Sequence, residues 1–536
     1  MKHLYSFLLS ALLCLSLSAQ NKVSGDSLAA DFHYLVKQLE AAHPDPYTGF
    51  GGKVFFHKQA FDLENELRSQ PHTLQEFWDK SMAFLSFIQD GHTYLFSLAP
   101  KQQQEQSYLP VGFRCIPDGL IVQSLPAAHQ DLLGSLLIGI NGKSMDELLV
   151  RTASLFACEN LYNRYSVFCR NVGRKQFMQQ LLPDLEDTVC LNLRTPDGKE
   201  VTLEQHFMEN EDLRKAEKVS LPSWEGCPEE QMAYRFIDKK KEVMMFKVNS
   251  IMARDNFEYM YKYMKGDLLR QMEFYYQNAL KKEMPADTLQ AIRALPSFSG
   301  TFAAMLKEMK KHHSEYLIID LRGNSGGWTP IVLASLYQLY GDKYLQKDMD
   351  TEYYRIVSPL YMNKLEITLE EFNRRYGTDY SFGDYTFSMK EQEDIPLDTL
   401  RRQFIDGCMS SVKEELRAQK GAPVYAPKQV FVVTDERTFS AAFHYAFMLW
   451  KMGATVVGVP SGQAPNTFME QTLFKLPYTG IEGSISNSVQ IFLPGKDKRA
   501  KTFWPDVMLT YDEYKQTGFD KQAEILFLLN KIGQEK

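Results

Sequence analysis

Apolar residues recur at three- and four-residue spacing through residues 26–88, which is the period of an amphipathic helix. The segment HPDPYTGFGG at 43–52 interrupts this pattern, because its prolines and glycines favour a loop. A third helical run follows Thr73, and Glu76 stands three residues further on, which predicts a capping box. We therefore expect a helical N-terminal region over residues 20–100.

From about residue 105 the pattern changes to short apolar runs that are separated by turn residues, as in β-rich domains. The stretch LLIGINGKSMDELL at 136–149 predicts a strand, a tight turn at Asn141-Gly142 and a helix. We expect a small β-rich domain over residues 105–207. The helical pattern that begins near Glu159 is interpreted as an insertion within it.

After a polar linker near residues 208–230, strand-like and helix-like segments alternate through the rest of the chain. Such alternation predicts βα units on a buried sheet, so the fold class expected for residues 230–536 is α/β. Residues 256–280 are predicted to be one long helical stretch. The Tyr-rich, charged residues at about 350–420 fit this order less well and are interpreted as a partly helical insertion.

Residues 1–19 have the features of a secretory signal peptide: basic MKH, an apolar run, and the small residue Ala19 before the expected cleavage point. We therefore expect an exported protein, periplasmic or extracellular. Leu13 precedes Cys14 where a small residue would be needed, so a lipoprotein anchor is not expected. No later run reaches the ~20 apolar residues of a membrane span.

The charges and the cysteines argue against several kinds of partner and site. The chain has 60 basic and 67 acidic residues without a basic stripe, which argues against nucleic acid as the main partner. The six cysteines that remain after Cys14 form no CxxC pair, so neither a zinc site nor a thioredoxin-like site is indicated. No metal ion or organic cofactor is expected.

The stretch IIDLRGNSGGW at 318–328 ends a predicted strand in glycine-rich turn chemistry. Glycines permit positive φ and close approach of the backbone, and successive N–H groups in such a turn can form an anion-binding nest. Gly326 and Gly327 are therefore candidates for an oxyanion hole, although a tight strand-to-helix turn would use the same residues. Asp320 and Arg322 are expected to brace the turn rather than to touch substrate.

Ser440 stands between an apolar run, FVV at 431–433, and the helical pattern SAAFHYAFMLW. It could be a helix N-cap, for which serine is a preferred residue. It could also be a nucleophile beside the unpaired N–H groups and partial positive charge of a helix N-terminus. In that case the N–H of Ala441 would help to hold an oxyanion.

Taken together, Asp-Leu-Arg-Gly-Asn-x-Gly-Gly and the later Thr-x-Ser-Ala-Ala resemble the tail-specific proteases of serine peptidase family S41. DGHTYL at 90–95, the IGING segment and Trp504-Pro505-Asp506-Val507 extend the resemblance over most of the chain, in the family's order. It implies a protease core of ββα-type (ClpP/crotonase-like) units and identifies the β-rich domain as PDZ-like. It also implies a peptide or protein substrate, whose C-terminus the PDZ-like domain would capture.

The Ser-Lys members of the family place a lysine about 25 residues after the serine, but no lysine occurs here from 452 to 474. Lys475 lies within the next strand-like run. The tricorn-like branch uses a histidine from the N-terminal side, and His92 in DGHT is the match. Histidine has a suitable pKa for a general base near neutral pH.

Three further residues concern either the choice of the general base or the group that orients it. His444, four residues after Ser440, is the rival histidine and is interpreted as a packed helix residue. The acid that orients histidine in the tricorn-like branch would align near Arg499, where Asp497 is the only acid close by. Thr93 is an alternative residue to orient His92.

The sequence therefore predicts an exported serine-type peptidase. The predicted catalytic residues are Ser440 and His92, and the predicted oxyanion hole is formed by Gly326 or Gly327 with Ala441. The alternative is a catalytically inactive S41-like protein that binds a peptide or another ligand. The substrate and the oligomeric state are left open.

Overall fold

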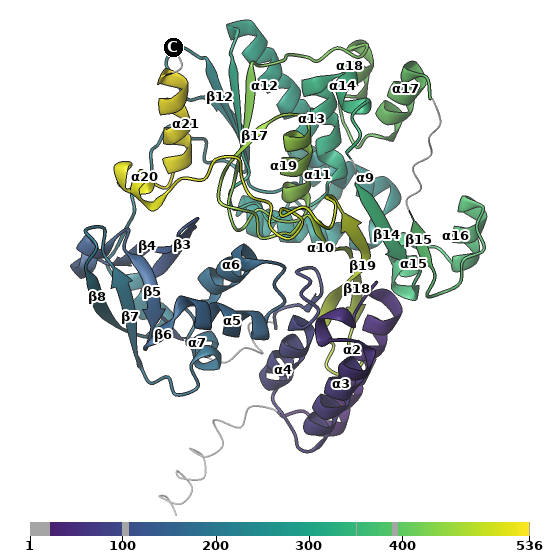
Figure 1. The fold of residues 1–536 in the computed structure, drawn as a ribbon. Coiled ribbons are helices and arrows are strands. Elements are labelled where there is room, and N and C mark those ends of the chain that lie inside the picture. The colour runs from purple at the N-terminus through teal and green to yellow at the C-terminus, as the bar shows by residue number, and fades with distance from the viewer. Residues whose placement is uncertain (1–21, 99–106, 350, 388–394, 535–536) are drawn as a thin grey trace, which may run out of the picture.

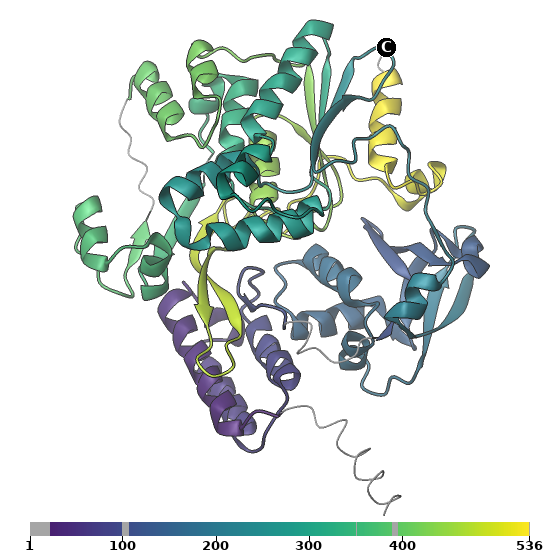
Figure 2. The same cartoon turned by 180° about the vertical axis from the view of Figure 1, so that it is seen from behind.

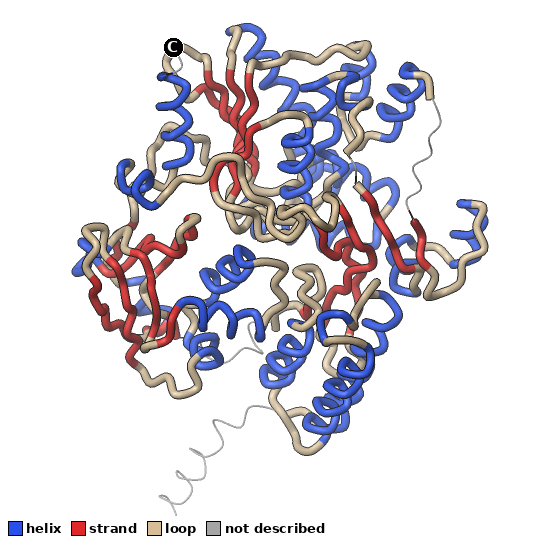
Figure 3. Tube along the Cα trace, in the orientation of Figure 1, coloured by secondary structure: helices blue, strands red, loops and turns tan. Residues whose placement is uncertain are grey.

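The computed structural model describes residues 22–98, 107–349, 351–387 and 395–534 (Figure 1). The predicted signal peptide, residues 1–19, lies outside the described residues. The described residues form three larger sheets and a two-stranded one, and in Figure 3 the larger sheets stand as separate groups of red strands. Among the described residues, no helix combines the length and the apolar character that crossing a bilayer requires.

The N-terminal region is helical, as predicted. Thr73 and Glu76 form the predicted capping box, because each side chain accepts a hydrogen bond from the other residue's backbone N–H. The elements of this region are α2 (Gly25–Ala42), η1 (Thr48–Phe50), α3 (Lys53–Arg68), α4 (Leu74–Ser86) and β1 (Tyr94–Leu95).

A β-rich module follows, which we define as residues 107–220. Its seven-stranded sheet has the order β10-β4-β5-β7-β8, with β3 on β4 and β6 on β5. The tight turn at Asn141-Gly142 and the helical insertion occur as predicted, but β10 comes from the segment predicted to be a linker. The elements are β2 (Ser107–Tyr108), β3 (Gly112–Ile116), β4 (Gly119–Pro126), η3 (Ala127–Leu132), β5 (Leu136–Ile140), β6 (Lys143–Ser144), α5 (Met145–Leu155), α6 (Leu161–Asn171), α7 (Lys175–Leu181), β7 (Thr188–Arg194), β8 (Glu200–His206), β9 (Met208–Glu209), α8 (Asn210–Lys215) and β10 (Lys218–Ser220).

The α/β core contains a five-stranded sheet of order β11-β12-β13-β16-β17, which is parallel from β12 to β17. The predicted helix over 256–280 is instead broken at Met264, which has φ −141° and ψ 63°. The elements of the core are β11 (Met232–Phe236), β12 (Val243–Val248), α9 (Arg254–Tyr263), α10 (Lys265–Tyr275), η4 (Tyr276–Leu280), α11 (Thr288–Ala294), α12 (Phe298–His312), β13 (Tyr316–Asp320), α13 (Pro330–Tyr340), α14 (Asp342–Leu345), β16 (Gln429–Thr434), α19 (Ala441–Lys451), β17 (Thr455–Gly458), α20 (Tyr511–Gln516) and α21 (Ala523–Gln534).

Both faces of this sheet are covered, which explains why its strands are continuous apolar runs. Successive side chains of a strand point to opposite faces. Phe246 packs with Phe302 of α12 and with residues of α13 and α19 on one face. Its neighbour Met245 packs with Leu528 of α21 on the other.

Residues 350–420 do more than form a helical insertion. Strands β14 and β15 join β1, β18 and β19 in a second five-stranded sheet. The long hairpin β18–β19 leaves the core and packs on the N-terminal helices through Phe474 and Ile485 (Figure 2). The elements added here are β14 (Glu352–Ile356), α15 (Pro359–Leu365), α16 (Leu369–Tyr376), β15 (Tyr385–Phe387), α17 (Leu397–Gly407), α18 (Lys413–Ala418), β18 (Asn466–Lys475) and β19 (Glu482–Ile491).

A buried chain of charges joins the module to the core. Arg114 of β3 donates to both carboxylate oxygens of Glu524 on α21, at 2.7 and 2.9 Å. Arg322 donates to Glu524 at 2.7 Å and to both oxygens of Asp320 at 2.9 Å, as expected of residues that brace a turn. Burial raises the pKa of Asp320, but the charges of Arg322 and Lys247 outweigh it and hold that pKa well below its usual range.

We expect Glu524→Gln to destabilise the protein by about 3–5 kcal/mol, because it leaves Arg114 and Arg322 buried without their shared carboxylate. Glu211→Gln, in an exposed pair with Lys215, is the control and should change stability very little. Thermal and denaturant unfolding of both variants measures the difference. Equally small changes in stability of the two variants would show that the buried charges do not hold the β-rich module to the core.

Candidate active site

Ser440 occupies a sharp turn between β16 and α19. It has φ +51° and ψ −126°, a strained conformation for a residue with a side chain. It precedes the first residue of α19, yet its side chain makes no capping hydrogen bond. The half-buried Ser440 side chain therefore does not cap α19.

The structure brings the glycine-rich turn and the Ser440 turn together, as their pairing in the sequence predicts. The N–H of Phe439 donates to the carbonyl of Asn324 at 3.1 Å, and the N–H of Gly323 donates to Asp435 Oδ2 at 2.8 Å. The N–H of Ser440 itself donates to the side chain of Gln463. The positive φ of Ser440 is thus held by bonds from two neighbouring loops.

Gly326 lies directly against this turn, and Gly327 lies against Ile251 and Met252. A Cβ on Gly326 would stand 2.6 Å from the Cβ of Ser440, and one on Gly327 would stand 2.2 Å from the carbonyl oxygen of Ile251. The N–H of Gly326 donates to Asn324 Oδ1 at 2.9 Å. Among the described residues, neither the N–H of Gly327 nor that of Ala441 has an acceptor within the chain.

His92 lies in the turn between α4 and β1 and is only 7% exposed. Its imidazole lies 5.0 Å, between ring centroids, from the ring of Phe439, the residue before Ser440. No direct hydrogen bond joins His92 to Ser440 in the described part of the chain. Burial lowers the pKa of His92 below 6.5, although the charge of Asp90 and the carbonyl of Phe468 oppose this shift.

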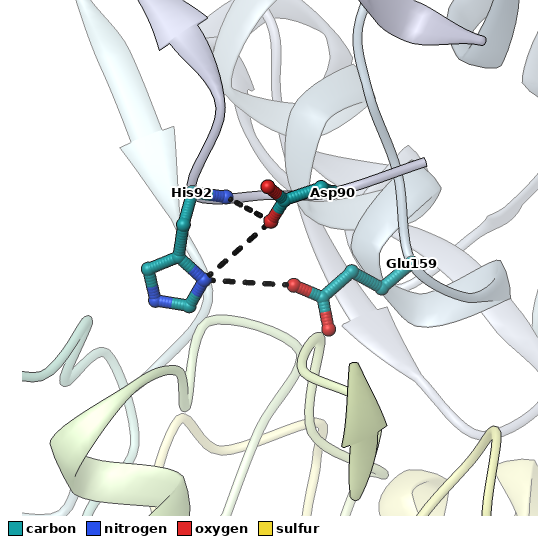
Figure 4. Close-up of side chains that lie close together, drawn as sticks. All are labelled: Asp90, His92 and Glu159. Carbon is teal, nitrogen blue, oxygen red and sulfur yellow. Dashed lines mark hydrogen bonds and ion pairs between the residues drawn. The ribbon is translucent and has the colours of Figure 1, made fainter. Parts of the chain in front are cut away.

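Two carboxylates face Nδ1 of His92 (Figure 4). Asp90 Oδ1 and Glu159 Oε1 each lie 3.9 Å from this nitrogen. Nδ1 is buried and has no hydrogen-bond partner among the described residues. The imidazole therefore presents an unsatisfied polar atom to two acids, and burying such an atom without a partner costs free energy.

Asp90 is held by its own neighbours. Its carboxylate accepts hydrogen bonds from the N–H of His92 at 2.8 Å, from His43 Nε2 at 3.3 Å and from the hydroxyl of Thr93. Burial raises the pKa of Asp90, but the hydrogen bond and charge of His43, with His92 and Thr93, bring that pKa down to about 2. Thr93 therefore orients Asp90 rather than His92.

Glu159 reaches the site from the β-rich module, one residue before the Asn160 cap of α6. Its Oε2 accepts the N–H of Ala464 at 2.9 Å, and its Oε1 accepts the N–H of Gly91 at 3.3 Å. Burial, and then the charge of Asp90, raise the pKa of Glu159 to about 8. Sequence reasoning missed this residue because nothing in its local sequence marks it.

The rival residues are engaged elsewhere. His444 is buried, with Nδ1 2.8 Å from Thr329 Oγ1 and Nε2 2.8 Å from Gln490 Oε1, and burial lowers its pKa to about 4. The Lys475 side chain is 65% exposed and lies 3.8 Å from Glu482.

Asp497, the acid near the position from which the tricorn-like branch orients its histidine, also lies away from His92. Asp497 pairs with Arg499 at 2.8 Å, and the Arg499 guanidinium lies over the ring of Trp450. No described contact joins either residue to His92. This region of the chain therefore supplies no orienting acid in the structure.

Asp90, His92 and Glu159 also have donor types that bind metals, and one ligand atom from each lies within 4.8 Å of the others. Around a tetrahedral Zn²⁺ with bonds of 2.0–2.1 Å, ligand atoms stand roughly 3.4 Å apart. The 3.9 Å separations here are wider, and Asp90 Oδ1 already accepts a backbone N–H. The arrangement fits a hydrogen-bonded relay better than a metal centre.

Substitutions of two glycines test how closely the glycine-rich turn packs against the Ser440 turn. Gly326→Ala should destabilise the protein by about 3 kcal/mol, because it adds a clash with Ser440 to the strain of a φ of +107°. Gly323→Ala, in the same turn with φ +76° and nothing within 4 Å of its Cβ, should cost only about 1 kcal/mol. Denaturant unfolding of both variants measures the difference, and equal costs would contradict close contact at Gly326.

Comparisons with known proteins support the same reading of the core. Residues 291–482 match the family model described as peptidase family S41. No curated protein matches the chain. Among solved structures, mature CPAF is similar at 14% identity and a TM-score of 0.54, with 95% of this chain and 98% of that chain covered.

Mature CPAF complexed with lactacystin is similar at 15% identity and a TM-score of 0.52, with 94% and 97% covered. At such identities the likeness shows the fold. The mixed α/β fold described above, with its helical N-terminal region and its sheets, agrees with it. The family-model match over residues 291–482 and the shared fold make the core of this chain similar to the peptidases of family S41.

Proposed function

We propose that this protein is a serine-type peptidase in which Ser440 is the nucleophile and His92 is the general base. The backbone of Ser440 is the observation that carries the proposal. A residue with φ +51° at a sharp strand-to-helix turn, without a capping role, resembles the strained turn that exposes the nucleophile in other hydrolases. Strain of this kind persists where the surroundings hold it, and it clusters at functional sites.

The environment of Ser440 suits a developing negative charge. The N-terminus of α19 contributes a partial positive charge, and the N–H of Ala441 is unpaired within the described chain. The N–H of Gly327 is likewise unpaired, whereas that of Gly326 is bonded to Asn324. We assign the oxyanion hole to Ala441 and Gly327, and the role of Gly326 is to let the two turns approach.

His92 suits the role of base better than its rivals. It lies beside Phe439, and its lowered pKa keeps it neutral at pH 7, the form that can accept a proton. Both ring nitrogens of His444 are engaged by hydrogen bonds. Lys475 is exposed and faces Glu482.

In the proposed reaction, His92 takes the proton of the Ser440 hydroxyl as its oxygen attacks the carbonyl carbon of a peptide bond. The resulting oxyanion accepts hydrogen bonds from the two N–H groups. His92 then gives the proton to the leaving amine, and water releases the acyl group by the same steps. The proposed substrate is a peptide or protein, bound by its C-terminus on a PDZ-like module, and the proposed location is outside the cytoplasm.

Ser440→Ala and His92→Ala should each lower kcat for cleavage of unfolded protein on the order of 10³- to 10⁶-fold, because each removes a member of one catalytic unit. Lys475→Ala is the matched control and should keep the activity of the unaltered protein. Initial rates on a labelled unfolded protein and on C-terminal peptides measure the effect.

A serine-directed phosphonate separates this proposal from a binding protein on the same fold. The unaltered chain should react with one equivalent at Ser440, and Ser440→Ala should not react, as mass spectrometry can determine. A protein that neither cleaves nor reacts would be a binding scaffold. If His92→Ala alone kept full activity, the base would be another residue.

A further inference from the structure

We infer that Glu159, a residue of the β-rich module, is the carboxylate that positions His92 for catalysis. The inference rests on the proposed function and adds to it the acid that the C-terminal region does not supply. It starts from the unpartnered Nδ1 of His92, which is buried and is directed at Asp90 and Glu159 (Figure 4).

Of the two acids, Asp90 presents to Nδ1 the more firmly bonded oxygen, because its Oδ1 accepts the N–H of His92 at 2.8 Å. It already accepts three hydrogen bonds, from the N–H of His92, from His43 and from Thr93. The Oε1 atom of Glu159 accepts the N–H of Gly91 at a long 3.3 Å, and the Thr467 hydroxyl also donates to this carboxylate. A shift of roughly 1 Å would bring this oxygen from 3.9 Å to hydrogen-bond distance of Nδ1.

The bond would decide which nitrogen of His92 carries the proton. A neutral imidazole is a donor at one nitrogen and an acceptor at the other. When Nδ1–H donates to the Glu159 carboxylate, Nε2 is left as the acceptor for the Ser440 proton. The same carboxylate then stabilises the imidazolium that forms during the reaction.

Glu159 is positioned by the contact between the module and the core. Its Oε2 accepts the N–H of Ala464, and the neighbouring Asn160 donates to the carbonyl of Ser461 at 3.1 Å. Both partners belong to the loop between β17 and β18, which also contains Gln463, the acceptor for the Ser440 N–H. One loop therefore holds the proposed acid and the backbone of the proposed nucleophile.

The pKa values of Glu159 and its neighbours predict how the catalytic activity should depend on pH. The titratable groups that face this cluster are Asp90, with His43 behind it, His92 itself, and His444 from α19. Burial and Asp90 raise the pKa of Glu159 to about 8, whereas burial lowers that of His92. Glu159 therefore ionises only as pH rises through about 8, at which His92 is already neutral.

The first measurement is kcat/KM of the unaltered protein between pH 5 and 10. We expect activity to rise through an apparent pKa near 8, because the carboxylate form of Glu159 is needed to accept Nδ1–H. This measurement needs no variant, so it tests the inference even if a substitution impairs folding. A profile complete by pH 6.5 and flat above it would overturn the inference.

The second measurement uses Glu159→Gln, which should lower kcat by roughly 10²- to 10⁴-fold, change KM by less than about threefold and abolish the rise near pH 8. Asp79→Asn is the matched control. Asp79 is a half-buried acid with a raised pKa between the helical region and the module, bonded to Gln75 and Gln176. It should leave both kcat and the pH profile unchanged.

The outcomes separate this inference from the proposed function. If Ser440→Ala abolishes cleavage while Glu159→Gln keeps the kcat and pH profile of the unaltered protein, Glu159 has no positioning role and the peptidase assignment stands. If the unaltered protein neither cleaves peptides nor reacts with the phosphonate, the peptidase assignment fails and this inference fails with it. A fall in thermal stability with an unchanged pH profile would assign Glu159 a structural role only.

Discussion

The buried carboxylate of Glu524 is the interaction on which the arrangement of the molecule depends. It neutralises Arg114 from the module and Arg322 from the end of β13, so three segments far apart in the sequence meet at one charge. Each of these ions would be costly to bury alone. Because Arg322 also binds Asp320, the network fixes the start of the glycine-rich turn, and with it one wall of the candidate active site.

The candidate site lies where separate parts of the chain meet, and no part contains it alone. The core contributes Ser440 and the two glycines, the turn after α4 contributes His92, and the module contributes Glu159. Small shifts between these parts would change the 3.9 Å separations that decide whether Nδ1 has a partner. In this arrangement the packing of the module against the core sets the geometry of the chemistry.

Periodicity predicted most helices and strands because each has one strong local pattern. The capping box at Thr73 and the turn at Asn141-Gly142 are encoded within a few residues, and both formed as predicted. The failures have tertiary causes. Strand β10 is weakly apolar and exists through pairing with β4. Residues 350–420 yielded β14, which pairs with the distant β19, and β15, which pairs with β14.

By itself, the sequence determined the helical N-terminal region, the α/β core and the two turns that meet at Ser440, because glycines, caps and apolar runs act locally. It also identified Ser440 and His92 as candidate residues. Only the tertiary structure brought Glu159 to His92 and excluded Asp497 from it, since an acid's role depends on which charges and hydrogen-bond donors surround it. A glutamate in a helical insertion has no local mark of that role, and burial beside Asp90 and His92 confers it.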